Sequence, residues 1–217
     1  MNKKGQEIMI WVLIAIGLTA IVLGMYAAVV TPAQTDNANT ETLATPVAMD
    51  EQRKGSESAK VTIVEYSDFQ CPACQYYYNM TKQLERERGD QVQFIFRHFP
   101  LQSHQHARTA AIAAEAAGRQ GRFWEMHDML FERQEEWSKS DDARQFLTGY
   151  ATLIGLDVGK FVGDAQLPEL DERIDSDIAE GTKQQIQGTP TFYLNGRVVQ
   201  FRSYEELQQL VDAELNK

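Results

Sequence analysis

The chain has 217 residues, and 31 acidic against 21 basic side chains give it a formal net charge of −10. This acidic balance argues against nucleic-acid binding, because a protein that neutralises phosphates needs a surplus of Lys and Arg on some face. When an apolar segment and a spacer at the front are set aside, about 160 residues remain, the usual size of one domain.

The first feature along the chain is an uncharged, apolar run over residues 8–30, which follows a short polar end at residues 1–7. A helix of this length spans the hydrocarbon core of a bilayer, which is roughly 30 Å thick. Lys3 and Lys4 precede the run, and the next basic residue is Arg53, so the N-terminus is expected in the cytoplasm and the remainder outside. The pattern predicts a single-pass membrane anchor and an extracytoplasmic domain.

Two kinds of processing are alternatives to an uncleaved anchor. A secretory signal normally has a shorter apolar region that ends in a small-x-small site, and only a weak site of this kind occurs at Thr31-Pro32-Ala33. Lys4-Gly5-Gln6 resembles a prepilin-type processing site, and a cut after Gly5 would leave the apolar segment attached. We expect the anchor to be retained.

Residues 31–59 are predicted to form a flexible linker. They are rich in Thr, Ala, Asn, Asp, Glu and Pro, and they show no helical or strand period. Such a segment cannot bury enough apolar surface to fold. We expect it to tether one folded domain, residues 60–217, that can turn towards different partners.

The only two cysteines, Cys71 and Cys74, follow an apolar run over residues 61–66 that predicts a central strand. Pro72 suits the first turn of a helix, which is expected to end at Arg88. Two cysteines at this spacing cycle between dithiol and disulfide, hold a soft metal, or lock a turn. Because the free amides of a helix N-terminus stabilise a thiolate, the position favours a reactive pair with a lowered pKa at Cys71.

The remaining elements follow from periodicity. Residues 92–99 predict a second strand, and a helix between two such strands makes a parallel βαβ unit with the cysteines at the carboxyl end of the sheet. From about 103 to 187 the signals are helical, which predicts an all-helical insertion. Asn195-Gly196 then predicts a hairpin turn, and a capping box at Ser203 and Glu206 begins a closing helix.

This α/β order of elements is that of a thioredoxin fold with helices inserted before the hairpin. Three segments, at residues 67–74, 96–101 and 188–192, resemble the motifs of the DsbA-like thiol:disulfide oxidoreductases, and the resemblance extends over roughly 55–217. It implies a cis proline that faces the cysteine pair, and Pro190 is the matching residue. A cis bond would let Thr189 present its amide and carbonyl to a bound peptide. The alternative is a trans proline that merely starts an edge strand.

The expected chemistry is thiol–disulfide exchange. Cys71 is predicted to carry the mixed disulfide and Cys74 to resolve it, with Thr189, Pro190, Pro72 and Ala73 contacting the bound client. Pro72-Ala73 provides no acid between the cysteines, so the helix end and Thr189 are expected to be the main stabilisers of the thiolate.

A membrane-tethered oxidase is the first choice of function. A reductase or isomerase of the same fold is second, and a non-catalytic metal or peptide binder is third. The expected partners are unfolded or cysteine-containing extracytoplasmic proteins and a membrane redox protein that recycles the pair. We expect a monomer whose redox centre is the cysteine pair itself, with no other cofactor.

Glu65 is the second candidate catalytic residue. It lies six residues before Cys71, on the strand face that carries Val61 and Ile63. We expect its carboxyl to be buried beneath the cysteines, with a raised pKa, where it can exchange a proton with Cys74. It also matches the buried acid that the resemblance implies. The alternative is a glutamate that reaches solvent or pairs with a lysine.

Three histidines lie beyond the cysteines, at His98, His104 and His106. Structural zinc sites combine two close pairs of ligands, and the sequence offers no second close pair beside Cys71 and Cys74. No metal site is predicted.

Overall fold

A computed structural model of the chain describes residues 42, 43, 45–49 and 51–217. The predicted cytoplasmic end, the predicted membrane helix and the first part of the predicted linker lie outside these residues. Within the described part of the chain, no helix has both the length and the apolar character needed to cross a bilayer.

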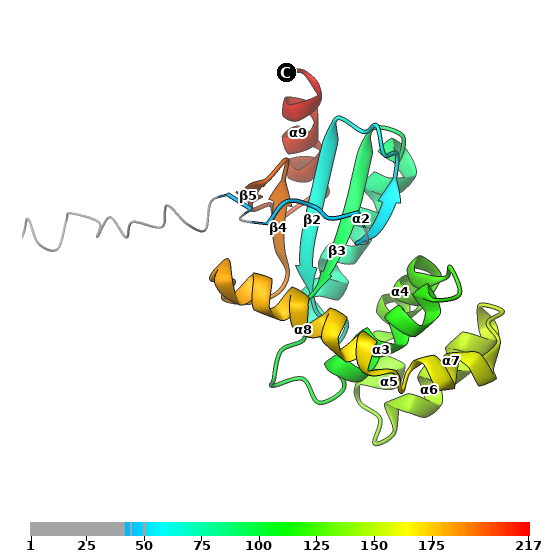
Figure 1. The fold of residues 1–217 in the computed structure, drawn as a ribbon. Helices are drawn as coiled ribbons and strands as arrows, with labels where there is room; N and C mark the ends of the chain where they lie inside the picture. The colour runs from blue at the N-terminus through cyan, green and yellow to red at the C-terminus, as the bar shows by residue number, and fades with distance from the viewer. Residues whose placement is uncertain (1–41, 44, 50) are drawn as a thin grey trace, which may run out of the picture. The chain divides into compact units, whose positions relative to one another are not determined.

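A five-stranded sheet forms the centre of the described chain (Figure 1). Its strands are β1 (Gln52–Gly55), β2 (Val61–Ser67), β3 (Val92–His98), β4 (Thr191–Leu194) and β5 (Arg197–Val199). They lie in the order β1-β3-β2-β4-β5, with β2 and β3 parallel and all other neighbours antiparallel. The predicted parallel pair followed by a hairpin is confirmed.

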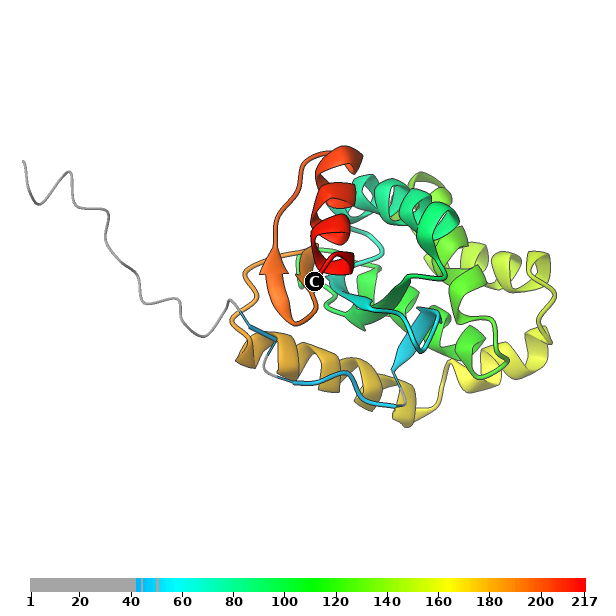
Figure 2. The same ribbon diagram turned by 90° about the horizontal axis from the view of Figure 1, so that it is seen from above.

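Helices cover both faces of this sheet (Figure 2). On one face lie α2 (Pro72–Arg88) and α9 (Tyr204–Leu215), and on the other lies α8 (Pro168–Lys183). The first face buries Val61 and Ile63 with apolar residues of α2 and α9, and the second buries Tyr66 and Ile95. Burial on two sides explains why β2 and β3 are continuous apolar runs rather than alternating ones.

The segment between β3 and β4 is helical, as the sequence predicts. Its helices are α3 (Ala107–Gly118), α4 (Phe123–Glu132), α5 (Gln134–Ser138), α6 (Ala143–Leu153), α7 (Val158–Asp164) and α8. They enclose a core of their own around Trp137 and Leu130, both fully buried. The end of α8 also packs on the sheet, where a Cβ at Gly181 would lie 2.7 Å from the ring of Phe99. Only glycine fits so close an approach.

The prediction of a flexible linker over residues 31–59 is wrong at residues 52–55, where the chain forms β1. β1 pairs with β3, from Gln52 opposite Phe96 to Gly55 opposite Gln93. Further back, the amide of Leu43 donates to the carbonyl of Gly196 at 2.6 Å. The sequence of β1 has no apolar period. The strand is stabilised instead by its hydrogen-bonded pairing with β3. Composition does not reveal such a partner.

The C-terminal elements form as expected. Asn195 and Gly196 have φ angles of 47° and 79°, the left-handed values that the hairpin turn requires. The Ser203 hydroxyl accepts a hydrogen bond from the amide of Glu206 at 3.3 Å and caps α9. The Glu206 carboxylate accepts from the amide of Arg202 rather than from that of Ser203.

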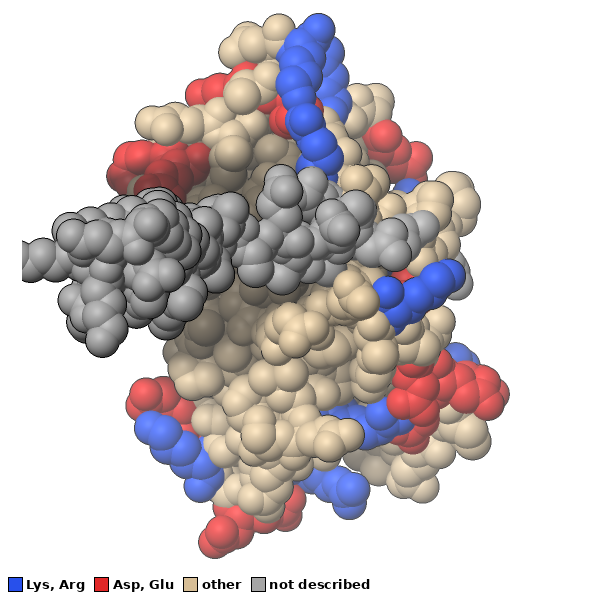
Figure 3. Space-filling view, turned by 90° about the vertical axis from the view of Figure 1, so that its left-hand side faces the viewer, with Lys and Arg blue, Asp and Glu red and all other residues tan. Residues whose placement is uncertain are grey.

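Charged side chains of both signs are interspersed around the face of the molecule shown in Figure 3. Among the described atoms visible there, Lys and Arg do not merge into one basic stripe. The described atoms visible on that face therefore form no extended positive surface of the kind that follows a phosphate backbone.

Candidate active site

Cys71 occupies the N-cap position of α2, and Pro72 is the first residue of the helix. The turn that leads from β2 to Cys71 is held by the buried carboxylate of Asp68. It accepts hydrogen bonds from the amides of Gln70 at 2.7 Å and Leu101 at 2.8 Å. The cysteine pair thus lies where the central strand ends and a helix begins, as the sequence predicts.

The two sulfurs have different environments. Both cysteines are free thiols, with Cys71 7% exposed and Cys74 fully buried. The pKa of Cys71 is lowered to about 5. A hydrogen bond from the Cys74 side chain contributes most, the Cys74 amide, the Thr189 side chain and the Ala73 amide add to it, and burial opposes them. Burial and the bond to Cys71 raise the pKa of Cys74. Cys71 is therefore ionised at neutral pH while Cys74 keeps its proton.

This division agrees with the predicted lowered pKa of Cys71 and corrects its cause. The helix amides and Thr189 contribute, as expected, but the thiol of Cys74 contributes most. The sequence could not reveal this ranking, because it depends on the orientation of one thiol towards the other.

The peptide bond between Thr189 and Pro190 is cis, and it lies beside Cys71. The sulfur of Cys71 is 3.5 Å from the carbonyl oxygen of Thr189, which can accept a hydrogen bond from the protonated thiol only. The Thr189 hydroxyl is buried and lies close enough to Cys71 to lower the pKa of its thiol. Pro72 and Ala73 are exposed at the start of the helix, next to these groups.

A groove of about 250 Å³ begins at Pro190. It is lined by Tyr77, Pro190, Thr191, Phe192, Val198, Val199, Gln200, Phe201 and Arg202. Strands β4 and β5 contribute four of these residues, and α2 contributes Tyr77. A short peptide segment next to a disulfide-linked client cysteine would meet this mixed apolar and polar surface.

Glu65 lies beneath the cysteines, on the sheet face that α2 covers. Its side chain is 8% exposed, and Ser67 donates a hydrogen bond to its Oε1 at 2.6 Å. Burial raises the pKa of Glu65 to about 7, against the effect of the Ser67 hydrogen bond, and the charge of Cys71 adds to the rise. The predicted burial and raised pKa are confirmed, and the alternative of a solvent-facing glutamate is wrong.

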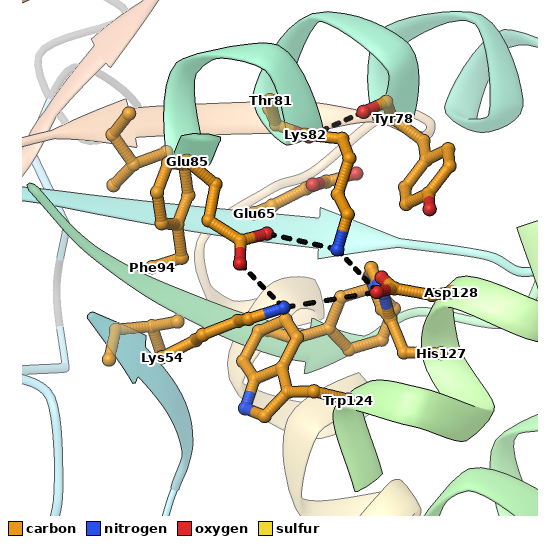
Figure 4. A pocket seen from close by; sticks show the side chains of 13 residues that line it. Lys54, Glu65, Tyr78, Thr81, Lys82, Glu85, Phe94, Trp124, His127 and Asp128 are labelled. Carbon is orange, nitrogen blue, oxygen red and sulfur yellow. Dashed lines mark hydrogen bonds and ion pairs between the residues drawn. The ribbon is translucent and has the colours of Figure 1, made fainter. Parts of the chain in front are cut away.

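The carboxyl of Glu65 borders a small pocket between β1, α2 and α4 (Figure 4). Its volume of about 30 Å³ is enough for roughly one water molecule. Four charged residues surround it: Lys54 and Lys82 contact Glu85 at 2.7 and 3.3 Å, and both lysines also contact Asp128. These residues come from three elements, so no local sequence pattern marks them.

Two glutamines bind the active-site turn to the helical segment, and sequence reasoning missed both roles. The side-chain amide of Gln134 donates to the carbonyls of Phe69 and Cys71, at 2.7 and 3.0 Å. The Gln70 side chain donates to Ser138 at 3.0 Å and accepts from the amide of His106 at 2.7 Å. Gln134 lies 63 residues from Cys71, and nothing in the sequence signals the contact.

The histidines considered as metal ligands are separated and engaged elsewhere. His98 bonds to Glu115 at 2.9 Å, His104 to Asp68 at 2.7 Å, and His106 to the carbonyl of Ser140 at 2.8 Å. Among the described residues, no group of three or more His, Cys, Asp or Glu side chains could hold a metal ion.

Comparisons with known proteins give three kinds of match. A family model described as Thioredoxin matches residues 48–213. The Na(+)/H(+) antiporter NhaA of Herminiimonas arsenicoxydans is 38% identical over 144 residues, which are 66% of this chain but 22% of that protein. The chain thus spans about a fifth of the length of the curated relatives that it matches.

Solved structures resemble the fold closely. BdbD from Bacillus subtilis superposes with a TM-score of 0.69 and 24% identity, covering 82% of this chain and 99% of that one. The thiol-disulfide exchange protein alpha-DsbA2 from Wolbachia pipientis gives a TM-score of 0.67 and 20% identity, covering 76% and 87%. At these identities the two structures establish the likeness of fold.

Proposed function

This chain belongs to the thioredoxin family, and on that basis we propose that it is a DsbA-like thiol:disulfide oxidoreductase that acts through Cys71 and Cys74. The observation that carries the proposal is the contrast between the two thiols. Cys71 has a pKa of about 5 at a helix start beside Pro190, and its partner Cys74 is buried and protonated. The likeness to the Wolbachia exchange protein supports the same chemistry.

The reaction consists of two exchanges. A client thiolate attacks the sulfur of Cys71 in the oxidised pair, the Cys71–Cys74 bond breaks, and its electron pair goes to Cys74, which takes up a proton. A second client thiolate then attacks the client sulfur of this mixed disulfide, and Cys71 leaves as a thiolate. The client gains a disulfide, and the pair is left reduced. Glu65, with a pKa of about 7, is the proposed proton partner of Cys74.

Net oxidation of clients is the proposed direction. A thiol of low pKa is a good leaving group, and a stabilised thiolate favours the reduced form of the pair, which makes its disulfide a strong oxidant. Cys71 has both properties. A reductase or isomerase of the same fold would use the same steps in reverse and is the second proposal.

We propose unfolded or cysteine-containing extracytoplasmic proteins as clients. Their backbone would contact Thr189 and Pro190, with Pro72 and Ala73 beside the reacting sulfur. A membrane redox partner would recycle the pair, which needs no further cofactor, and the protein would act as a monomer. Ion transport is not part of the proposal, because the match to the antiporter spans 22% of that protein.

The oxidase is tested by refolding reduced ribonuclease with the oxidised protein. Recovery of ribonuclease activity is expected with the wild type and not with Cys71→Ser. A titration against glutathione should then place the reduction potential nearer about −120 mV than about −270 mV. A value near the lower figure would make the protein a reductase, and full binding or refolding activity in Cys71→Ser would favour a non-catalytic binder.

The membrane anchor over residues 8–30 is proposed from the sequence alone. The full chain, made in bacterial cells, should stay in the membrane fraction after carbonate extraction, while a variant without residues 8–30 should be released. A protease added to spheroplasts should digest the domain, because the domain is expected on the outer side of the cytoplasmic membrane. Release of the full chain by carbonate would end the anchor proposal without affecting the proposed chemistry.

A further inference from the structure

We propose that the hydroxyl group of Ser67 carries the proton between the carboxyl group of Glu65 and the sulfur of Cys74. The inference rests on the proposed exchange reaction and adds a residue to it. Neither the cysteine motif nor the family match marks Ser67 for such a role.

The placement of Ser67 is the first support. It is the last residue of β2, two positions after Glu65, so both side chains project from the same sheet face. Its hydroxyl donates to Glu65 Oε1 at 2.6 Å, a short distance for such a bond. The same side chain interacts with the sulfur of Cys74 and favours its ionised form. Ser67 is therefore hydrogen-bonded to one end of the proposed proton transfer and lies close enough to the other to lower its pKa.

The chemistry of a hydroxyl group is the second support. It can accept a hydrogen bond from one group while it donates its own hydrogen to another. When Cys71 carries a mixed disulfide, it no longer accepts the hydrogen of the Cys74 thiol, and that thiol can donate to the Ser67 oxygen while Ser67 donates to the Glu65 carboxylate. Ser67 is 1% exposed and Cys74 fully buried, so bulk water has no direct access to the transfer.

The transfer balances in both directions. When the Cys71–Cys74 disulfide opens, the electron pair left on Cys74 takes the Ser67 proton, and Ser67 takes one from the neutral Glu65 carboxyl. When Cys74 attacks a mixed disulfide at Cys71, the two protons move the other way, and Glu65 ends protonated. The client or recycling partner supplies or accepts the electrons of the disulfide, as in the proposed function.

The proton on Glu65 exchanges with solvent through the small pocket of Figure 4. The titratable groups that border this pocket from β1, α2 and α4 are Lys54, Tyr78, Lys82, Glu85, His127 and Asp128. The two lysines and two carboxylates among them pair with one another. The charges of these four cancel, and Glu65 is the carboxyl group on this pocket whose charge acts on Cys74.

A matched pair of variants tests the relay. Ser67→Thr and Ser67→Val place side chains of equal shape on the strand, and only threonine retains a hydroxyl. The assay loads Cys71 with a coloured aromatic thiol as a mixed disulfide and follows its release when Cys74 attacks. Between about pH 6 and pH 8 we expect Ser67→Val to slow this release at least about tenfold, and Ser67→Thr to stay within about threefold of the wild type.

The pH profile separates proton transfer from packing. Release in the wild type and in Ser67→Thr should rise with an inflection near the Glu65 pKa of about 7, and Ser67→Val should lose that inflection. Equal rates in the two variants, or equal slowing with the inflection kept, would overturn the relay. A wild type that releases no thiol and refolds no ribonuclease would instead overturn the proposed function. Urea unfolding of each variant verifies that it folds.

Discussion

The thiolate of Cys71 is stabilised mainly by the residue that later forms the disulfide with it. Cys74 contributes both a thiol hydrogen bond and a backbone amide, and burial opposes them. The pKa of Cys71 is thus set mainly by the other cysteine of the pair. The Pro72-Ala73 dipeptide between the two cysteines contains no charged group. A hydrogen bond to a charged group is worth about 1.5–3 kcal/mol, which equals about one to two pKa units.

Replacement of Cys74 should therefore raise the pKa of Cys71. In Cys74→Ala we expect a rise of about one to two units above the wild-type value of about 5, because the donor is lost. Cys74→Ser retains a hydroxyl donor and should rise less. Ultraviolet absorbance of the thiolate against pH measures both. An unchanged Cys71 pKa in Cys74→Ala would show that the helix amides and Thr189 alone are enough to stabilise the thiolate.

Glu65 makes the stability of the reduced protein depend on pH. Its pKa is raised from 4.5 to about 7 in the folded state, so the contribution of its neutral form is complete below pH 4.5 and is lost as the pH rises through 7. The difference of about 2.5 units corresponds to about 3 kcal/mol. Ionised Glu65 thus destabilises the folded, reduced chain at alkaline pH.

Glu65→Gln, which stays neutral, should remove this loss. Relative to the wild type, its free energy of unfolding should increase with pH from 5 to 8 by about 2.5 kcal/mol, since part of the effect has already developed at pH 5. Urea unfolding of the two reduced proteins at several pH values gives this difference, in which the titration of Cys71 largely cancels. A constant difference across that range would mean that Glu65 is not the titrating group.

At the scale of elements, α5 fixes the turn that carries the first cysteine. This helix has only five residues, yet its first residue, Gln134, satisfies the carbonyls of Phe69 and Cys71. Gln134 is 4% exposed, so water cannot replace the amide. The helical segment therefore positions the active-site turn as well as covering it.

Loss of this amide should destabilise the domain. We expect Gln134→Leu to lower the free energy of unfolding by about 2 kcal/mol, because two carbonyls lose a donor in a dry site. Gln120→Leu is the matched control: Gln120 also forms two hydrogen bonds, to Asp157, but both are exposed. The control should change stability by less than about 0.5 kcal/mol. Equal effects in urea unfolding would contradict the positioning role.

At the scale of the whole described molecule, a buried ion pair joins the N-terminal segment to the sheet. Arg97 of β3 is fully buried, and its guanidinium donates twice to Glu51, at 2.8 and 2.9 Å. It also donates to the hydroxyl of Tyr66 at 2.7 Å and to the carbonyl of Thr45 at 3.2 Å. This cluster ties down the chain just before β1.

Glu51→Gln should loosen that segment. The variant leaves the buried guanidinium of Arg97 with only its more distant carboxylate, Glu180 at 3.4 Å, and we expect the free energy of unfolding to fall by about 2 kcal/mol, less than for a fully broken buried pair. Amide exchange over Gln52–Gly55 should become faster than in the wild type. Glu57→Gln, at an exposed position, should alter neither quantity. Slow exchange retained in Glu51→Gln would show that the β1–β3 ladder is sufficient.

The sequence by itself determined the parts of the protein whose signals are local. Periodicity and the Asn195-Gly196 turn located β2, β3, β4 and β5 but not β1, and the spacing of Cys71 and Cys74 around a proline located the candidate redox pair. Position on the strand also placed Glu65 under that pair, because side chains two residues apart share a sheet face.

Only the tertiary structure decided the contacts between distant segments. Three such features are the pairing of β1 with β3, the Gln134 hydrogen bonds and the ion pairs of the two lysines beside the Glu65 pocket. Each joins residues far apart in the chain. None has a periodic or spaced signal, since each depends on which elements the fold brings together. The tertiary structure also decided which group lowers the Cys71 pKa most. That ranking depends on the distance and orientation between individual atoms, which the sequence does not specify.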